Sequence, residues 1–456
     1  MTPRKTKNLR MPTQPSEPLR VVNPDAAAID VHSEVHWVCV PSDRDPQPVQ
    51  KFGSFTVDLE AIADFLARCR ITTVVMESTG VYWIPLYELL ERRGFRVLLI
   101  DPRKARRLEG RPKTDRLDCQ WLQRLHAFGL LAGAFRPPDQ IVELRTYLRQ
   151  RQMLLTYAAV HIQHMQKALE QMNVKLTEVV SDITGATGTR IITAILEGVR
   201  DTQVLANMRD CRCKNDVETI AKALQGNWRA EHLFTLKQAV DLYGFYHQQI
   251  AACEGKIEAQ LGAFADRSGG KPLRPKPGGR RTVNAPGFDA RTLLYRFSGV
   301  DLTVIEGIES TTALVILSEI GYDLSRFPSV KHFTSWLGLC PNRKISAGKV
   351  KSSHVRPGTN RVAQALRLAA RSLHSSKSAL GAFLRRLKSR MGKAQAITAT
   401  AHKLARLVYA VLKNGTEYVR KGLEEYETQY RERLIRNFQR KARELGFTLV
   451  PAVPPG

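Results

Sequence analysis

Two aspartates, Asp115 and Asp118, stand three residues apart in the run Lys-Thr-Asp-Arg-Leu-Asp. The apolar residues that follow at helical spacing predict a helix, and residues three apart on a helix share one face. Neighbouring carboxylates repel each other unless a cation lies between them, and a divalent metal ion is the usual cation in proteins. For an isolated pair, a solvated helix face with alternating charges is the alternative interpretation.

Positively charged residues surround this aspartate pair. They would attract an anionic polymer toward a metal ion held there. These residues are Arg103, Lys104, Arg106, Arg107, Arg111, Lys113 and Arg116.

Two further acids lie on predicted strands. Asp30 lies in the apolar run 26–32, and Glu77 ends the β-branched run 72–77. Further strands are expected at 35–40, 51–56 and 95–101, with helices at 58–70 and 82–93. The order of three strands, helix, strand, helix and strand is that of a ribonuclease-H-like α/β domain. Its first and fourth strands are adjacent, so we expect Asp30, Glu77 and the aspartate pair to converge as a two-metal nuclease centre.

The composition favours a partner rich in phosphates. Lys and Arg number 70 against 43 Asp and Glu, which gives a net charge of +27 over 456 residues. Seven scattered cysteines without a CxxC motif indicate reduced thiols rather than a disulfide framework or a zinc knuckle. The sequence contains no run of about twenty apolar residues, so no membrane span is predicted. The glycine-rich motif that cradles phosphates in ATPases is also missing from the sequence.

The middle of the chain is predicted to be helical. From Leu144 to Leu176, apolar residues recur at alternating spacings of three and four, with Arg151 as the one break. This pattern is typical of a coiled coil or a long helical hairpin, and we expect scaffold and dimer surface here. His161 and His164 are three residues apart on the same helix. We interpret them as solvated or seam-flanking, because no third metal ligand is in view.

Six ranges follow from these patterns. They are a disordered basic arm (1–24), the α/β domain (25–140), the helical region (141–264), a basic Gly/Pro linker (265–297), a mainly helical C-terminal domain (298–420) and a charged tail (421–456). The fold class is therefore α/β plus all-α. Around Gly307, residues 304–315 are similar to a helix-hairpin-helix element, which offers backbone N–H groups to a DNA phosphate. An ordinary turn between two helices is the alternative.

A serine close to a glycine, Ser346, lies among cations in the C-terminal domain. Its hydroxyl could attack a phosphate whose charge the cations stabilise. A basic loop whose serines only hydrogen-bond phosphate explains the same residues, and the two interpretations stay open at this point. The surrounding candidates for nucleic-acid binding are Arg343, Lys344, Gly348, Lys349 and Lys351.

Taken together, these motifs resemble the insertion-sequence transposases of the IS-one-ten type, the DEDD recombinases, over about residues 25–415. Their RuvC-like acids correspond to Asp30 in Ala-Ile-Asp-Val-His, Glu77 in Met-Glu-Ser-Thr-Gly, and the Asp115–Asp118 pair. Their C-terminal pattern corresponds to Trp-Leu-Gly-Leu-Cys-Pro followed by Ser346. Here Ile345 replaces the first of two paired serines and Ala347 replaces a glycine, so Ser352 and Ser353 stay alternative nucleophiles.

The resemblance implies a recombinase that excises and inserts an insertion sequence. The four acids would hold Mg²⁺, two ions in each site, and Ser346 would form a phosphoserine–DNA intermediate. Strand exchange would pass through a four-way junction. The implied partners are double-stranded DNA at the element junction and target, a structured noncoding guide RNA, and further copies in a dimer or tetramer, in the prokaryotic cytoplasm at the nucleoid.

Two other functions are compatible with the same residues. A RuvC-like junction nuclease, or another metal-dependent nuclease, would cut DNA with water and use its last domain only for binding. It predicts that Ser346→Ala leaves cleavage intact. A non-catalytic nucleic-acid-binding protein of the same fold predicts that Asp30→Ala and Asp115→Asn have no effect on activity.

Overall fold

The chain folds into two compact units, residues 1–136 and 137–456. The structure is a computed structural model, and it describes residues 20–78, 80–101, 114–276, 284–342, 344–346, 349–355, 358 and 360–448. The predicted basic arm lies almost wholly outside the described residues. Within the described part of the chain, no helix combines the length and the apolar character that crossing a membrane requires.

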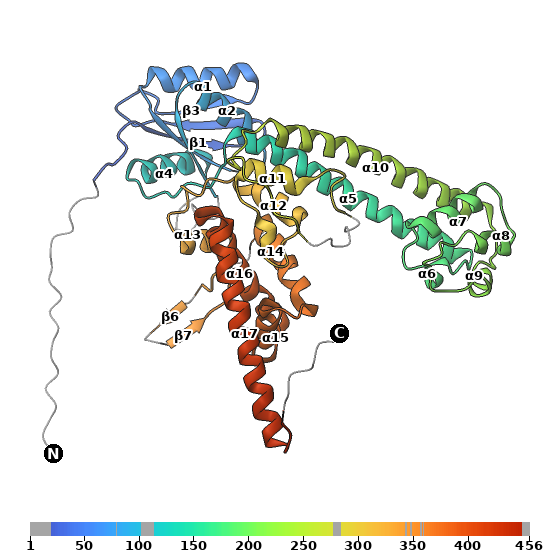
Figure 1. Cartoon of the computed structure of the whole chain (residues 1–456). Helices are drawn as coiled ribbons and strands as arrows, with labels where there is room; N and C mark the ends of the chain where they lie inside the picture. Colours follow the sequence, from blue (N-terminus) through green and yellow to red (C-terminus); the bar gives the residue numbers. More distant parts are fainter. Residues whose placement is uncertain are drawn as a thin grey trace, which may run out of the picture. The chain divides into compact units, whose positions relative to one another are not determined.

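The first unit is built on a five-stranded sheet in the order β3-β2-β1-β4-β5 (Figure 1). Strands β1 and β2 and strands β2 and β3 pair antiparallel, whereas β1 with β4 and β4 with β5 pair parallel. The strands and helices are β1 (Ala26–Val31), β2 (Val35–Cys39), β3 (Val49–Gly53), α1 (Thr56–Arg68), β4 (Thr73–Glu77), α2 (Trp83–Arg92), β5 (Arg96–Ile100) and α4 (Asp115–Ala127). This element order is the predicted one, and β1 and β4 are adjacent as expected.

Helices cover both faces of this sheet. Helices α1 and α2 share an apolar core with alternate residues of β1 and β4, such as Ile29 and Met76. On the other face Cys119 and Leu122 of α4 pack against Ala28 and Val75. Side chains of a strand point to opposite faces in turn, so a central strand with both faces covered is apolar along its length. Every residue of β1 is accordingly buried, and all but Asp30 are apolar.

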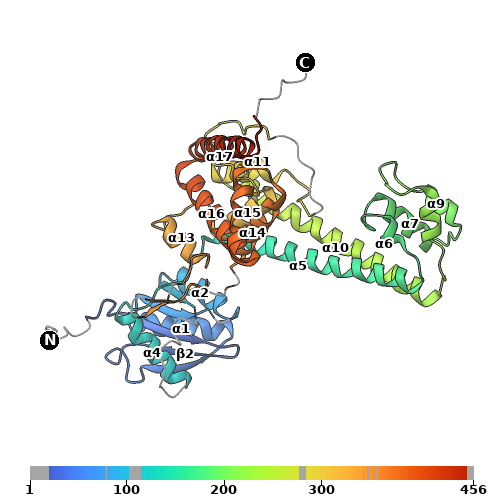
Figure 2. The same ribbon diagram turned by 90° about the horizontal axis from the view of Figure 1, so that it is seen from below.

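Two long helices run antiparallel in the second unit (Figure 2). They are α5 (Asp139–Gln171) and α10 (Ala230–Ala263). The heptad seam of α5 therefore packs within the chain as a helical hairpin, one of the two arrangements predicted. The break at Arg151 is buried, and its guanidinium donates to Glu254 Oε1 at 2.8 Å and to the carbonyl of Asn284 at 3.0 Å.

A small helical cluster lies at the end of this hairpin. Helices α6 (Leu176–Val179), α7 (Ala186–Leu196), α8 (Thr202–Asn207) and α9 (Val217–Ala223) are labelled there in Figure 1. They share one apolar core with the adjoining ends of α5 and α10. His161 lies beside this region, with its ring stacked on Tyr246 at 5.3 Å and edge-on to His164 at 5.5 Å. The neighbours of His161 are thus aromatic, in keeping with a seam-flanking histidine.

The remainder of the second unit is mainly helical. Its elements are α11 (Ala290–Ser298), the 3-10 helix η1 (Leu302–Val304), α12 (Ser310–Ile320), α13 (Val330–Trp336), β6 (Lys344–Ser346), β7 (Lys349–Ser352), α14 (Arg361–Ser372), the 3-10 helix η2 (Leu373–Ser375), α15 (Ala379–Arg390), α16 (Lys393–Asn414) and α17 (Thr416–Glu444). The predicted charged tail thus largely forms the helix α17.

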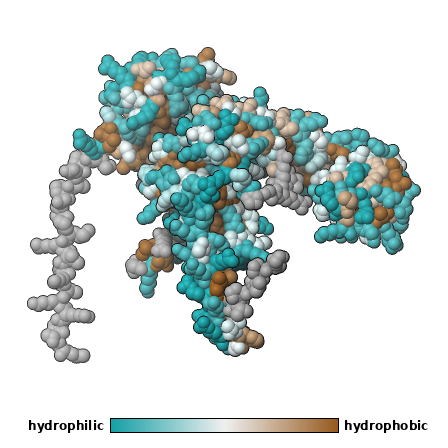
Figure 3. Space-filling model, viewed as in Figure 1, coloured by the Kyte–Doolittle hydropathy of each residue, from teal (hydrophilic) through white to brown (hydrophobic). Residues whose placement is uncertain are grey.

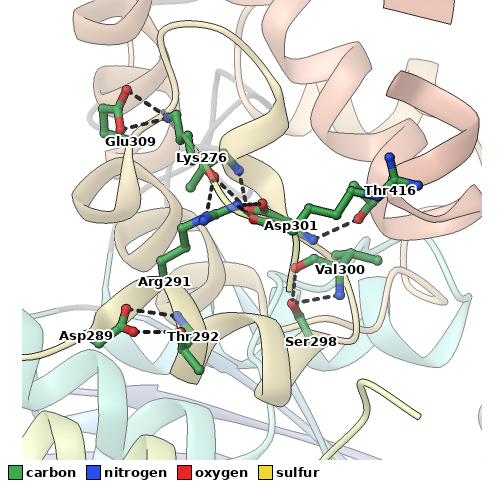
Figure 4. A network of polar contacts seen from close by, with 11 residues as sticks. Lys276, Asp289, Arg291, Thr292, Ser298, Val300, Asp301, Glu309 and Thr416 are labelled. Atoms are coloured by element: carbon green, nitrogen blue, oxygen red, sulfur yellow. Dashed lines mark hydrogen bonds and ion pairs between the residues drawn. The ribbon is translucent and has the colours of Figure 1, made fainter. Parts of the chain in front are cut away.

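The predicted linker 265–297 differs from the structure in one respect. Its last part forms α11, and Arg291 of that helix donates to Asp301 Oδ2 at 2.6 Å and to the carbonyl of Arg274 at 2.9 Å (Figure 4). Lys276 donates to both carboxylate oxygens of Glu309 (Figure 4). The flanks of the Gly/Pro run are therefore joined to the helical core by ion pairs, which composition alone does not reveal.

The helix-hairpin-helix-like element also takes a different form. The element directly before Gly307 is the short 3-10 helix η1 rather than an α-helix, and α12 follows it. Gly307 has a φ of +83°, and a Cβ there would meet the carbonyl oxygen of Ala369 at 2.9 Å. Close packing against α14 therefore accounts for this glycine. Its predicted contact with a DNA phosphate remains a prediction.

Candidate metal centre

Asp30 and Glu77 lie at the carboxyl ends of adjacent parallel strands. The register pairs Ile29 with Met76, so the next step along β1 and β4 sets Asp30 beside Glu77. Side chains alternate along a strand, and Ala28 and Val75 point toward α4. Asp30 and Glu77, two residues further on, therefore lie on that same face of the sheet. Asp30 is only 8% exposed.

Helix α4 brings its aspartates to this edge because three side chains fix its direction across the sheet. Cys119 Sγ donates to the carbonyl of Ala28 at 3.3 Å, and Gln123 Nε2 donates to that of Ala26 at 3.0 Å. Further along the helix, His126 Nε2 lies 3.0 Å from Thr73 Oγ1 at the start of β4. The helix thus runs antiparallel to β1 and begins where β1 ends. Asp115 and Asp118 occupy that first turn.

The start of α4 is set by its sequence. Thr114 is the N-cap residue, and its hydroxyl accepts a hydrogen bond from the backbone N–H of Leu117 at 3.3 Å. Threonine is a favoured N-cap, and acids in the first helical turn are stabilised by the helix dipole. The same residues that could bind a metal are therefore favourable for the helix itself.

His32 joins the aspartates at the edge of the sheet. Its Nε2 lies 3.3 Å from Asp30 Oδ2 and 3.8 Å from Asp115 Oδ1. One ligand atom from each of the three residues lies within 4.8 Å of the others, a spacing compatible with a shared cation. Burial raises the pKa of Asp30 above its ordinary value. The charge and hydrogen bond of His32 oppose that rise, and the charges of Asp115 and Asp118 add to it.

This electrostatic balance has a chemical consequence. The charges of Asp115 and Asp118 disfavour the ionised form of the buried Asp30, whereas the half-exposed His32 favours it. A divalent cation at this point would favour the ionised carboxylates, which are the ligands that Mg²⁺ and Mn²⁺ take in proteins. Sequence reasoning missed His32, although the Asp-x-His spacing at the end of the predicted strand was a usable signal.

The predicted basic approach to the acids lies mostly outside the described residues. This is the case for Arg103, Lys104, Arg106, Arg107, Arg111 and Lys113. Arg116 is described, and it is exposed on the first turn of α4 between the two aspartates. An anion that approaches the two aspartates would therefore come close to the positive charge of Arg116.

Ser346 lies in the second unit, on a two-stranded hairpin. Strands β6 and β7 pair antiparallel, with Ser346 opposite Lys349 and Ile345 opposite Val350. Ser346 is exposed, as are Lys349 and Lys351. Apolar surface is visible over this hairpin in Figure 3, where Ile345 is 62% and Val350 56% exposed. The predicted basic loop is therefore a strand pair that presents its serine to the surroundings.

Part of the predicted serine site falls outside the described structure. Arg343 and Gly348 are not described, and neither is the side chain of Lys344. Of the alternative nucleophiles, Ser352 ends β7 and Ser353 follows it, whereas Ser346 ends β6 beside the turn. The assignment among the three serines stays a prediction.

The sequence is similar to those of known transposases. Residues 27–174 match a family model described as a transposase with DEDD acids of the IS110 type, and residues 301–385 match one described as the IS116/IS110/IS902 transposase family. A protein of insertion element IS110 from Streptomyces coelicolor, named as uncharacterised, is 32% identical over 120 residues. That stretch is 26% of this chain and 29% of the relative, so the chain spans less than a third of the relative's length.

Proposed function

Because the chain belongs to the IS110 family of transposases, we propose that it cuts and rejoins DNA to excise and insert an insertion sequence. The observation that carries this proposal is the convergence of Asp30, Asp115 and His32 at one edge of the sheet, with Glu77 next to Asp30 in register and Asp118 on the same helical turn. Such a set is suited to holding divalent cations against a phosphodiester.

The order β3-β2-β1-β4-β5, with β2 antiparallel to β1, supports a ribonuclease-H-like and RuvC-like fold for the first unit. Mg²⁺ is the cation that we propose for its acids, two ions in each site. Bound there, the ions would neutralise the charge that develops on the phosphate. Asp30 would be the central ligand, because it lies deepest in the sheet.

Ser346 is the nucleophile in this proposal. Its Oγ attacks the phosphorus of the scissile phosphodiester, forms a phosphoserine–DNA ester and releases a deoxyribose hydroxyl, which receives a proton in exchange for the one that serine loses. Attack by a hydroxyl of another strand reverses these steps and restores the serine. One phosphoester bond replaces another at each step, so no nucleotide triphosphate is needed. Lys349, opposite Ser346, would attract the phosphate.

The partners are proposed on similar grounds. The net charge of +27 supports binding to double-stranded DNA at the element junction and target, together with a structured noncoding guide RNA. Further copies of the chain would complete a dimer or tetramer. Apolar residues exposed at helical spacing on α5, namely Met153, Tyr157 and Val160, support an interface on the hairpin.

The test is formation of a covalent protein–DNA adduct. The full chain is mixed with Mg²⁺, labelled DNA across the element junction and transcript from the element's flanks, and then run on a denaturing gel. We expect a labelled adduct for the wild type and for Ser353→Ala, and none for Ser346→Ala or Asp118→Ala. Ser353→Ala is a matched control, because its hydroxyl belongs to the same basic segment.

Two results would contradict the proposal. Cleavage without an adduct, unaffected by Ser346→Ala, would leave a metal-dependent nuclease that acts by hydrolysis. An adduct that survives Ser346→Ala and disappears in Ser352→Ala or Ser353→Ala would transfer the nucleophile to that serine.

A further inference from the structure

We infer that His32 is a direct nitrogen ligand of the metal centre, so that the centre binds Mn²⁺ more tightly than Mg²⁺. This inference rests on the proposed function, because it requires that the acids bind a divalent cation. It adds a ligand to the four acids and a preference among metals.

The position of His32 supports a ligand. One nitrogen, Nε2, lies near carboxylate oxygens from two different elements, at 3.3 Å from Asp30 on β1 and 3.8 Å from Asp115 on α4. Neighbouring ligands of an octahedral ion that bonds at about 2.1 Å are roughly 3 Å apart, and opposite ligands roughly 4.2 Å. The observed separations, all within 4.8 Å, require only small side-chain adjustments to meet one ion.

The backbone holds His32 at this point. β1 ends at Val31, and the N–H of His32 donates to the carbonyl of Val35 at 3.1 Å, which closes the turn into β2. The ring is therefore positioned by the same strand that positions Asp30. Its side chain is 44% exposed, which leaves it open to solvent ions.

A simpler role for His32 is a hydrogen bond that orients Asp30. One N–H on Nε2 serves one carboxylate well, yet here two carboxylates from separate elements lie at the same nitrogen. Two oxygens and one nitrogen that all lie within 4.8 Å of one another are spaced as a ligand set can be, whereas an orienting contact needs only Asp30. The arrangement therefore favours coordination through the lone pair of a neutral ring.

Nitrogen coordination changes the choice of metal. Mg²⁺ prefers oxygen ligands and retains several waters, whereas first-row transition ions accept imidazole readily. A centre with His32 and the acids should hold Mn²⁺ more tightly than an all-oxygen centre does. Without His32, the preference for Mn²⁺ over Mg²⁺ should shrink.

The test measures metal binding by the full chain without DNA. Mn²⁺ is titrated against the wild type, His32→Ala, His32→Gln and Asp118→Ala, and free Mn²⁺ is read from its electron paramagnetic resonance signal. Pulsed measurements on the bound ion then detect coupling to a directly bonded ¹⁴N nucleus. His164→Ala, which removes an exposed histidine from α5, is the matched control. Circular dichroism checks that each variant is folded, and His32→Gln keeps a polar side chain at the edge.

We expect ¹⁴N coupling in the wild type and in His164→Ala, and its loss in both His32 variants. Mn²⁺ affinity should fall about tenfold or more in His32→Ala. Mg²⁺ affinity, measured by competition, should fall less. Bound Mn²⁺ with no ¹⁴N coupling and unchanged affinity in His32→Ala would overturn the role of His32 and leave the acid centre standing. Equal, negligible binding by the wild type and Asp118→Ala would overturn the acid centre itself.

Discussion

Two buried carboxylates, Asp30 at the edge of the sheet and Glu319 at the end of α12, have opposite surroundings. Each residue is 8% exposed. Arg149 donates to both oxygens of Glu319 at 3.0 and 2.9 Å, and Arg145 lies 3.2 Å from it. Asp30 instead faces His32 and two further aspartates.

This difference separates a structural acid from a candidate functional one. Glu319 obtains its countercharge from the chain, so the folded protein is complete there without any ligand. Asp30 has two aspartates and one half-exposed histidine as its charged neighbours, and an external cation would add positive charge there. The burial of an acid therefore says less about its role than the sign of the groups around it.

The largest expected effect comes from removing the carboxylate of Glu319, and with it the ion pairs to Arg145 and Arg149. Glu319→Ala removes a buried carboxylate that accepts from Arg149 twice and lies 3.2 Å from Arg145, so we expect a loss of about 3–5 kcal/mol in local stability. Hydrogen exchange of peptides from α12 measures it. Glu309→Ala, at the other end of the same helix, breaks an exposed pair with Lys276 and should cost less than about 1 kcal/mol. Equal losses of stability in Glu319→Ala and Glu309→Ala would show that the buried ion pairs of Glu319 contribute no more than an exposed pair.

A smaller effect should follow from adding the external cation. Mn²⁺ at about 100 times its dissociation constant should stabilise the first unit by about 2.7 kcal/mol. Asp30→Asn should abolish this gain and, without metal, should raise stability at neutral pH. The raised pKa of Asp30 means that ionisation costs stability as pH rises above 3.8 through the folded pKa. Denaturant unfolding with and without Mn²⁺ measures the stabilisation by the metal and the metal-free stability of each protein. A metal-free Asp30→Asn variant that is less stable than the wild type would contradict the second expectation.

Helix α4 offers a third kind of buried group, an uncharged histidine. Burial, with the charge of Arg96, lowers the pKa of His126 from 6.5 to about 4. The unfolded chain takes up this proton below pH 6.5 and the folded chain only near pH 4. Stability is therefore complete above pH 6.5 and is lost as pH falls, by about 2 kcal/mol between pH 7 and pH 5. Unfolding at the two pH values measures the loss. His126→Gln should reduce this dependence, and an unchanged dependence would assign it to other groups.

The smallest effect is expected for Arg361, the third arginine near Glu319. Arg361 Nε lies 4.0 Å from Glu319, and the Arg361 side chain is 48% exposed. Such a pair contributes little, so Arg361→Ala should change local stability by less than about 1 kcal/mol. A loss as large as that of Glu319→Ala, seen by hydrogen exchange of α12, would mean that all three arginines act as one network.

The sequence was informative where apolar patterning determines the structure. The buried strands around Asp30 and Glu77 gave their order and adjacency, because their position in the sheet follows from hydrophobic runs and element order. His32 was missed because a half-exposed residue just after a strand carries no burial pattern. The hairpin at Ser346 was predicted as a loop, since its strands are short and Ile345 and Val350 lie on the surface rather than in a core.

Contacts between residues far apart in the chain could not be predicted from the sequence either. The heptad seam of α5 predicted a helical partner without identifying it, and 58 residues lie between the end of α5 and the start of α10. Arg151 appeared as a flaw in the seam, whereas Glu254 on α10 makes it an ion pair. A single sequence contains the two residues but not their proximity.

The helical hairpin of α5 and α10 has a mechanical consequence. A straight helix of the length of α5 extends about 50 Å. The cluster of α6 to α9 lies at the far end of the hairpin. Near the other end, Arg145 and Arg149 form ion pairs with Glu319 of α12. From Arg149 to the end of α5 is 22 residues, or roughly 33 Å, so a rotation of roughly 10° about the Glu319 contacts would move the far end by roughly 6 Å. The ion pairs around Glu319 thus help to determine the direction in which the hairpin extends.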